Sequence, residues 1–405
     1  MRVVHERCCE LDIHQRSITA CLLTPEGRFL RTIGTTTAEL REFTDWLVEE
    51  RCTHVAMEST GIYWKPIFNI IEKTRITPML VNARHIKAIP GRKTDVKDAE
   101  WIADLLQHGP LRGSFVPDRE WRELRQAVHE RRNLIEEHAR VINRIMKALE
   151  TGNVKLKSVI SDVLGVSGRA MLEAIVRGET DPKVIAAEVK THLKATPQEI
   201  EQAVEALLDK HHQFMLKMHL THLDYLDELI AAFDAEIEKR MRPFFGEIAR
   251  LDGIPGVGER GAQEIIAEIG VDMSRFPTAN HLCSWAKMCP GLKQSGGKRT
   301  KASIGDGNRY LRSALIEAAW AASHTKQSYL RSQCWRLKGR RGDKRAIVAV
   351  GHSILRTGYY LLRDGGTYKD LGPNYYDERA REQAVKSSVR RLQRLGYHVT
   401  IEEAA

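Results

Sequence analysis

The sequence predicts an α/β domain with a mixed sheet at its N-terminus, then a long helical region, and finally an α-helical domain. Three observations support this: apolar alternation near the N-terminus, a sevenfold apolar repeat in the middle, and helical patterns separated by glycine turns afterwards. The 405 residues correspond to two or three domains at roughly 150 residues each. Hydrophobic residues make up 42% and charged residues 29%, which excludes the disordered and low-complexity classes.

The first domain is expected over residues 1–115. Alternating apolar residues predict three consecutive strands, at 7–13, 17–23 and 28–33. The patterns that follow predict a helix, a strand, a helix, a strand and a closing helix, at 38–50, 54–57, 63–73, 77–81 and 95–107. Thr94 is expected to cap the closing helix, whose first turn is acidic. This order of elements is that of a ribonuclease-H-like fold.

The middle region, residues 116–245, is expected to contain two long helices. The first carries an apolar residue at every seventh position, which predicts a coiled-coil seam: Trp121, Val128, Ile135, Ile142 and Leu149. The second is expected to end at Pro243 and to carry an apolar stripe along its length: Ile200, Val204, Leu207, Phe214, Met218, Leu226, Leu229, Phe233, Ile237 and Met241. The two helices form either a hairpin within one chain or a stalk between two chains, and the sequence favours neither.

Between these helices, residues 151–197 are expected to form a small inserted lobe. Its helical pieces are short because glycine and proline interrupt the pattern, at Gly165, Gly168, Gly178 and Pro182. The last part divides into a helical domain at 246–370 and a tail at 371–405.

Positive charge is concentrated in one segment of the chain. The whole sequence has a formal net charge of +10, whereas Pro290–Arg363 holds 16 Lys and Arg against 3 Asp and Glu, a net charge of +13. A solvated basic face is the ordinary explanation of such a run. Because the excess is so local, we expect the segment to contact nucleic-acid phosphates.

Four acids lie where a ribonuclease-H-like fold brings side chains together. Asp12 ends the first predicted strand, Glu58 follows the fourth, and Asp95 and Asp98 share one face of the closing helix. Clustered carboxylates repel one another unless a hard cation neutralises them, so the set predicts a Mg²⁺ site acting on a phosphodiester. Four other acids are interpreted as ordinary solvated surface groups: Glu10, Glu72, Glu100 and Asp104.

A Gly-x-Gly turn at Gly256 and Gly258 is expected to join two helices. Amide groups at the start of the second helix could hold a phosphate, as in a helix-hairpin-helix element. The alternative is a plain packing turn between helices, and both interpretations stay open.

A polar turn at Gln294-Ser-Gly-Gly-Lys-Arg299 is the second candidate for chemistry. Ser295 lies beside basic residues that could stabilise charge on a phosphate, and we expect the same group to bind nucleic acid: Lys298, Arg299, Lys301, Arg309 and Arg312. From this motif alone, an exposed turn serine is the more common interpretation.

Other site classes find no support in the sequence. The 7 cysteines show no zinc-ligand spacing, and no Walker A motif is present. No apolar run reaches the ~18 residues of a membrane helix, and the first residues, Met1-Arg-Val-Val-His-Glu-Arg7, lack the apolar core of a signal peptide, so we expect a cytoplasmic location.

Taken together, the motifs resemble those of one known family. In chain order they are Leu11-Asp-Ile-His14, Ala56-Met-Glu-Ser-Thr-Gly-Ile-Tyr63, Lys93-Thr-Asp-Val-Lys-Asp-Ala99, Val163-Leu-Gly-Val-Ser-Gly-Arg-Ala170, Ile254-Pro-Gly-Val-Gly258, Ser295-Gly-Gly-Lys298 and Arg345-Ala-Ile-Val-Ala-Val350. This set resembles the DEDD transposases of bacterial insertion sequences, which are recombinases guided by a bridge RNA. The sequence departs from the family pattern at Glu10, where glycine is common, and at Gly296, where alanine is frequent. Neither change removes a reacting group.

The resemblance implies a RuvC-like N-terminal domain and a C-terminal transposase domain. It implies that Asp12, Glu58, Asp95 and Asp98 bind Mg²⁺ and that Ser295 is a nucleophile forming a phosphoserine with DNA. It also implies a guide RNA from the element's flank, donor and target DNA, and dimers assembling to tetramers that associate with the bacterial nucleoid when bound to DNA. Because the acids and Ser295 belong to different domains, a site using both must be composite.

The resulting prediction is an RNA-guided DNA recombinase that cuts and rejoins strands. Two alternatives remain: a RuvC-like nuclease that hydrolyses junctions with metal alone, and a nucleic-acid-binding scaffold without activity. A covalent protein–DNA adduct separates the recombinase from the nuclease, and metal-dependent cleavage separates both from the scaffold.

Overall fold

The computed structural model describes residues 3–59, 61–81, 95–111, 113–205, 207–290, 293–295, 298–300, 304–305, 307–379 and 381–401. Within these ranges, side chains are described outside residues 95–100, 293–295, 298–300, 377 and 382–384. The chain divides into two compact units, Met1–Arg122 and Glu123–Ala405. Three residues that the sequence-based predictions name, Thr94, Gly296 and Lys301, lie outside the described residues.

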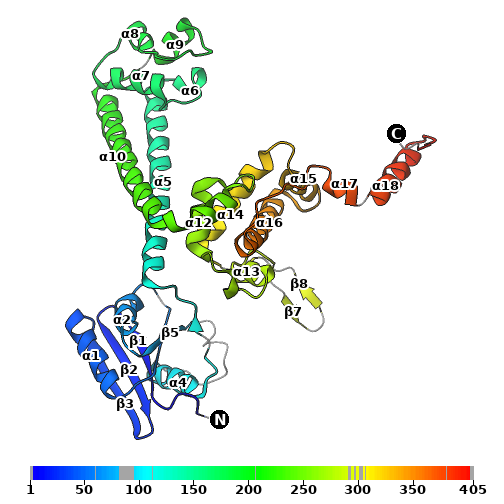
Figure 1. Cartoon of the computed structure of the whole chain (residues 1–405). Helices are drawn as coiled ribbons and strands as arrows, with labels where there is room; N and C mark the ends of the chain where they lie inside the picture. The colour runs from blue at the N-terminus through cyan, green and yellow to red at the C-terminus, as the bar shows by residue number, and fades with distance from the viewer. Residues whose placement is uncertain are drawn as a thin grey trace. The chain divides into compact units, whose positions relative to one another are not determined.

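The first unit is built on one six-stranded sheet with the order β3-β2-β1-β4-β5-β6 (Figure 1). Strands β1 and β2 pair antiparallel, as do β2 and β3, whereas β4 is parallel to both β1 and β5. The elements are β1 (Cys8–Ile13), β2 (Ser17–Thr24), β3 (Gly27–Gly34), α1 (Thr37–Glu49), β4 (His54–Glu58), α2 (Trp64–Ile71), β5 (Thr77–Val81), α4 (Asp95–His108) and β6 (Gly113–Ser114). The mixed α/β domain and its element order are confirmed, and β6 is an additional edge strand.

Helices cover the two faces of this sheet. Leu11 and Met57 belong to the apolar cluster formed with α1 and α2, whereas Cys8 and Ala56 belong to the cluster formed with α4. The alternation of side chains along each strand therefore separates an α1/α2 face from an α4 face (Figure 1). At the start of α1, Thr36 and Glu39 form a reciprocal capping box, which fixes where that helix begins.

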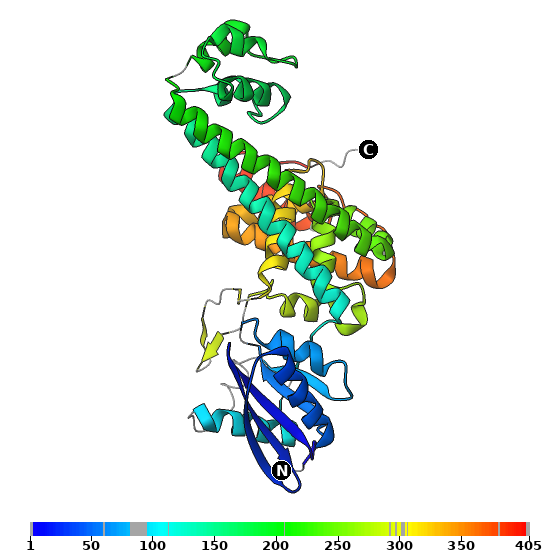
Figure 2. The same ribbon diagram turned by 90° about the vertical axis from the view of Figure 1, so that its left-hand side faces the viewer.

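The second unit begins with two long helices, α5 (Arg119–Thr151) and α10 (Lys210–Met241), which lie side by side (Figures 1 and 2). Ion pairs join His138 to Asp227 over 3.1 Å and Arg131 to Asp234 over 3.1 Å, so the later residue of α5 pairs with the earlier one of α10. The helices are therefore antiparallel within one chain. Of the two arrangements left open above, the hairpin is the one present here.

The coiled-coil seam remains a prediction in its details. Val128 and Leu149 are buried, while Ile135 and Ile142 are only half-buried. The apolar core between α5 and α10 uses a broader face than the sevenfold track, with Leu134 and Val141 fully inside it.

The second long helix differs from the expectation. The chain forms α9 (Pro197–Val204), breaks, and restarts as α10, whose N-terminus is capped by the Asp209 side chain accepting from the His212 amide. The break rotates the buried face, so Leu207, Phe214 and Met218 of the expected stripe are exposed. Leu226, Ile237 and Met241 of the expected stripe are buried, together with Leu216, Leu220 and Leu223, which the stripe did not include.

The inserted lobe lies at the far end of the long helices (Figures 1 and 2) and contains α6 (Leu156–Val159), α7 (Val166–Val176), α8 (Pro182–Ala187) and α9. The expectation that Gly168 breaks a helix is wrong, because Gly168 lies inside α7. A β-carbon at Gly168 would overlap the Val163 carbonyl oxygen, so glycine is needed there for close packing.

The rest of the second unit is mainly helical. Its elements are η1 (Arg242–Phe244), α11 (Phe245–Asp252), α12 (Gly258–Ile269), η2 (Met273–Arg275), α13 (Ala279–Trp285), β7 (Lys293–Ser295), β8 (Lys298–Thr300), α14 (Arg309–His324), α15 (Tyr329–Arg341), α16 (Asp343–Asp364), α17 (Tyr375–Arg379) and α18 (Arg381–Arg394). Ser295 lies in the β7–β8 hairpin, whereas the sequence predicted only a polar turn around it. In the described part of the chain, no helix combines the length and apolar character that spanning a membrane requires.

Candidate active site and nucleic-acid interface

Asp12 is the penultimate residue of β1 and Glu58 is the last residue of β4, so both lie at the same end of two neighbouring parallel strands. The register pairs Leu11 of β1 with Met57 of β4, so the next position places Asp12 opposite Glu58. Directly opposed residues of parallel strands project to the same face. The Asp12 side chain is 44% exposed and its Oδ2 lies 3.2 Å from Nε2 of His14.

Both acids belong to the face that α4 covers. Cys8 and Ala56 face α4, and Asp12 and Glu58 are an even number of residues further along their strands. The period of two in a strand returns them to that face. The fold therefore directs these two carboxylates toward the side of the sheet on which α4 lies.

Helix α4 runs antiparallel to β1. The Gln107 carbonyl accepts from the amides of Val4 and His5 at 2.8 and 3.1 Å, and the Ala103 carbonyl accepts from Sγ of Cys8 at 3.9 Å. Moving backward along α4 therefore means moving forward along β1. At about 1.5 Å per helical residue and 3.3 Å per strand residue, the first turn of α4 lies near the level of the end of β1.

That first turn carries Asp95 and Asp98. Their backbone is helical, but the structure does not describe their side chains. Among the described residues, no group of three or more His, Cys, Asp or Glu side chains forms a metal site. Asp12 and Glu58 supply two oxygen donors of the type that Mg²⁺ prefers, so the donor chemistry at this edge fits the predicted cation.

Glu10 is buried, so its interpretation as a solvated surface acid is wrong. It is 1% exposed, pairs with Ala56 in the β1–β4 register, and lies two residues before Asp12 on the α4 face. Glu72 is also engaged, accepting from Nη2 of Arg122 at 2.6 Å. The sequence signal missed at Glu10 is strand alternation, which places position 10 beside the buried position 8.

Ser295 is the last residue of β7. The hairpin register pairs it with Lys298 and pairs Gln294 with Arg299. The backbone thus sets Ser295 directly opposite Lys298 on the neighbouring strand, although the side chains of this hairpin lie outside the description. An isolated bridge between Pro290 and Ile304 pairs the segments that lead into and out of it.

The chain leaves the hairpin into α14, which Asn308 caps by accepting from the amides of Tyr310 and Leu311 at 3.0 and 3.1 Å. Arg309 is exposed, with its guanidinium 5.7 Å from the Tyr310 ring centroid. Arg312 donates to the carbonyl of Gly305. One of these two predicted phosphate ligands is thus open to solvent, and the other holds the loop.

A buried polar network behind this loop was missed in the sequence. The Glu268 side chain is 1% exposed and accepts from His129 and from Asn308. His129 stacks on Tyr310 with ring centroids 3.4 Å apart, and Arg125 donates to the carbonyls of Ala267 and Glu268 at 3.0 and 2.9 Å. The network ties α5, α12 and the start of α14 together.

The Gly-x-Gly turn combines two roles. Gly256 has φ +87°, and a β-carbon there would overlap the backbone of Ala318 and Ala322 on α14. Gly258 has φ +65°, begins α12 and faces open space. Packing accounts for the glycine at Gly256, so an amide site for phosphate is a proposal that rests on Gly258.

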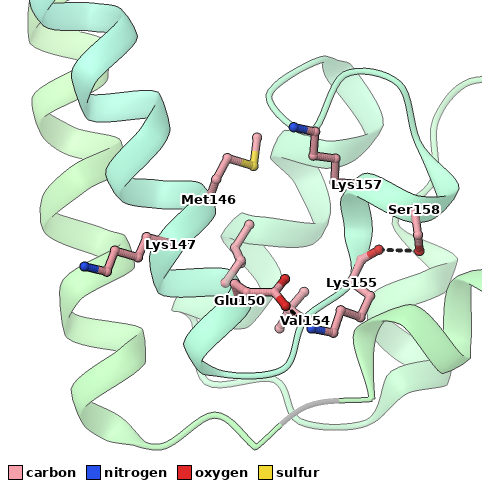
Figure 3. A pocket seen from close by; sticks show the side chains of 8 residues that line it. Met146, Lys147, Glu150, Val154, Lys155, Lys157 and Ser158 are labelled. Atoms are coloured by element: carbon pink, nitrogen blue, oxygen red, sulfur yellow. Dashed lines mark hydrogen bonds and ion pairs between the residues drawn. The ribbon is translucent and has the colours of Figure 1, made fainter.

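A cavity of about 540 Å³ lies where α5 ends and α6 begins (Figure 3). Glu150 and Lys155 form an ion pair beside it, and Ser158 donates to the Lys155 carbonyl at 2.7 Å. Glu150 and Lys155 are thus engaged with each other. The lining residues are Met146, Lys147, Leu149, Glu150, Val154, Lys155, Lys157 and Ser158.

Comparison with known proteins identifies the family. Residues 9–153 match the DEDD transposase model of the IS110 type, and residues 248–334 match the model described as the transposase IS116/IS110/IS902 family. The first match covers the sheet with Asp12 and Glu58, and the second covers the Gly-x-Gly turn and the Ser295 hairpin. The chain belongs to this transposase family. An N-terminal part and a C-terminal part of the transposase are thus each matched by a family model of their own.

Relatives of this transposase cover most of its length. The uncharacterized protein of insertion element IS110 from Streptomyces coelicolor is 26% identical over 74% of the chain and 78% of its own length. The transposase of insertion sequence element IS1111A from Coxiella burnetii is 25% identical over 73% of each chain. The pilin gene-inverting protein of Moraxella lacunata is 23% identical over 87% of the chain and 94% of its own length.

Proposed function

We propose that this transposase is an RNA-guided DNA recombinase of an insertion sequence, which cuts and rejoins donor and target DNA. What supports it most is the β1–β4 register, whose continuation places Asp12 opposite Glu58, with the first turn of α4, which carries Asp95 and Asp98, near the same level. The strand order β3-β2-β1-β4-β5, with β1 to β3 antiparallel and β1, β4 and β5 parallel, supports a RuvC-like fold. The family assignment supports DNA as substrate.

Asp12, Glu58, Asp95 and Asp98 would hold Mg²⁺. When bound, the cation would polarise the scissile phosphate and stabilise the leaving oxygen. The chain's own contribution is to fix two carboxylates on parallel strands, whose geometry is set by backbone hydrogen bonds of the sheet rather than by a loop. Asp12 is half-exposed, which leaves room for a phosphodiester to approach.

Ser295 would act as the nucleophile. Its Oγ loses its proton and forms a bond to phosphorus as the bond to the leaving strand breaks, and the departing oxygen takes up one proton in exchange. The phosphoserine keeps the energy of the phosphodiester until a new strand end attacks it, which regenerates the serine. Lys298 and Arg299 on β8 provide positive charge for this phosphate.

The partners of this reaction are donor DNA, target DNA and a guide RNA. The net charge of +13 over Pro290–Arg363 supports phosphate binding, and we assign contacts to Gly258, Lys298, Arg299, Lys301, Arg309 and Arg312. We further propose that the chain assembles as dimers that form tetramers on DNA. Light scattering of the protein with and without nucleic acid measures that assembly.

The test is a denaturing gel of labelled DNA incubated with the full chain, guide RNA and Mg²⁺. Ser295→Ala is expected to abolish both the covalent protein–DNA band and recombination, because it removes the attacking oxygen. Ser284→Ala, which changes an exposed serine on α13, is the matched control and should retain both. A shifted band persisting in Ser295→Ala would overturn the nucleophile assignment.

The same gel distinguishes the junction nuclease. If the unmutated chain cleaves DNA in Mg²⁺ and leaves only free ends with no adduct, hydrolysis replaces strand transfer and the recombinase proposal is wrong. Recombination that is unchanged by removal of the guide RNA would overturn RNA guidance separately.

A further inference from the structure

A second cavity, of about 300 Å³, lies among α14, α15 and the start of α16. Its floor is formed by buried residues, Cys334 at 6% exposure and Ile347 at 3%, while Trp320 and Trp335 on its lining are 46% and 58% exposed. The remaining lining residues are Ser323, His324, Lys326, Arg331, Lys338 and Asp343. The cavity is therefore apolar at its base, with aromatic and basic groups around it.

Helical spacing gathers these side chains. On α15, Arg331, Trp335 and Lys338 are separated by four and three residues, which places them on one face. On α14, Trp320 and His324 are four residues apart and their rings stack with centroids 6.5 Å apart. The two helices pack against each other and against α16, so the two faces contribute to one cavity.

The charge of the cavity is positive. Lys326, Arg331 and Lys338 oppose a single acid, Asp343, whose Oδ2 lies 3.2 Å from Nζ of Lys338. The Lys338 ammonium also lies 5.2 Å from the Trp335 ring centroid. A phosphate group would find basic partners here and would compete with Asp343 for Lys338.

We propose that this cavity binds an unpaired nucleotide of single-stranded DNA. An exposed indole offers a flat surface on which any base can stack, and neighbouring Lys and Arg bind the phosphates on either side of it. A cavity of about 300 Å³ is at the lower end of the range for small ligands, which suits one base and excludes a stacked duplex. A paired base is enclosed in its helix and reaches such a site only by leaving the stack.

The occupant is assigned as DNA because the family acts on DNA, so the proposal rests on the proposed function in that respect alone. It adds a binding site outside the Ser295 hairpin and the acidic sheet edge. During strand exchange, DNA passes through unpaired states. A site for one unpaired nucleotide would hold a released strand and keep it from re-pairing.

The test is fluorescence anisotropy of a labelled oligodeoxythymidine with the full chain in EDTA, so that binding is measured without cleavage. Trp335→Ala and Trp320→Ala are each expected to weaken binding about tenfold, a typical loss for one stacked base. Trp335→Phe keeps a ring and should restore most of the affinity. Trp285→Ala removes a tryptophan that is 42% exposed on α13, outside the cavity, and should change binding less than twofold.

Matched duplex and RNA oligonucleotides decide the occupant. Duplex binding should change less than twofold in the Trp320 and Trp335 variants, and equal weakening for duplex and single strand would overturn the proposal in favour of a general phosphate surface. A larger loss for RNA than for DNA would assign the cavity to RNA and overturn the choice of DNA. No change in any binding curve overturns the site altogether, while leaving the Ser295 adduct assay unaffected.

Asp343→Asn is expected to change the affinity for single-stranded DNA in the opposite direction to the tryptophan variants. Removing the acid frees Lys338 and makes the cavity more positive, so single-stranded DNA should bind several-fold more tightly. Because a variant that merely loosens the fold weakens binding, tightening is a result that a structural role would not produce. Unchanged or weaker binding would contradict the assignment of Lys338 to phosphate.

Discussion

The two units each pair a carboxylate with a histidine, in opposite surroundings. In the first unit, Asp12 and His14 are 44% and 66% exposed and lie 3.2 Å apart. In the second, the Glu268 and His129 side chains are 1% and 24% exposed, and Glu268 also accepts from Asn308. The same two chemical groups therefore form a surface pair in one unit and part of an interior network in the other.

The difference in exposure distinguishes a carboxylate that can bind a cation from one that stabilises the fold. A buried carboxylate must have its hydrogen bonds satisfied within the protein, because an unsatisfied buried charge is costly. Glu268 thus has its oxygens engaged by α5 and α14. The Asp12 side chain is 44% exposed at a strand end, where it remains accessible to a cation. A carboxylate–histidine pair is therefore a candidate cation-binding site only where the carboxylate is exposed to solvent.

The largest expected effect is on the chemistry at Asp12. Asp12→Asn keeps the size of the side chain and removes its charge, so DNA cleavage in Mg²⁺ should fall by more than ~100-fold, since even outer partners of metal ligands typically cost ~10- to 100-fold. Cleavage of labelled DNA by the full chain measures this. The thermal unfolding midpoint should stay unchanged, and undiminished cleavage would exclude Asp12 from the metal site.

The next effect concerns stability at Glu268. Glu268→Ala leaves His129 and Asn308 without their buried acceptor and removes the ion pair with Arg125, so it should lower the free energy of unfolding by about 3 kcal/mol. Urea denaturation followed by circular dichroism provides the measurement. Glu268→Gln keeps an acceptor oxygen and should lose less than Glu268→Ala. Equal stability of the alanine variant and the unmutated chain would show that the network contributes nothing.

The smallest effect is expected at His14. An exposed ion pair contributes about 0 to 1 kcal/mol, so His14→Ala should leave urea denaturation almost unchanged. Cleavage should also stay within about twofold, because the proposed cation binds oxygen donors. A loss of activity as large as that of Asp12→Asn would mean that His14 takes part in the reaction. The exposed Asp12–His14 pair would then be more than a weak surface ion pair.

Much of the first unit could be predicted from sequence, because its elements are short, strongly patterned and bounded by local signals. The strand at Thr77–Val81 is observed with its predicted bounds, and the helix that begins at Asp95 ends within one residue of its prediction. The convergence of Asp12 and Glu58 follows from parallel pairing once the strand order is known. Local pattern and topology together were sufficient there.

Features that depend on distant partners could not be predicted. His129 and Glu268 are 139 residues apart, and no local pattern connects them. The break before α10 depends on a single cap at Asp209, which a continuous apolar stripe conceals. The cavity beside Trp320 and Trp335 joins three helices, so its shape appears only when they pack.

The lobe between the long helices has a consequence for the order of folding. Two backbone hydrogen bonds tie its ends, from the Lys155 amide to the Ala203 carbonyl at 2.7 Å and from the Leu207 amide to the Gly152 carbonyl at 2.9 Å. Because these contacts bring the end of α5 beside the start of α10, the entropy of closing the chain is lost within the lobe. We expect the lobe to form first. The long helices α5 and α10 then pack against each other turn by turn, starting beside the lobe, and each turn adds only local contacts.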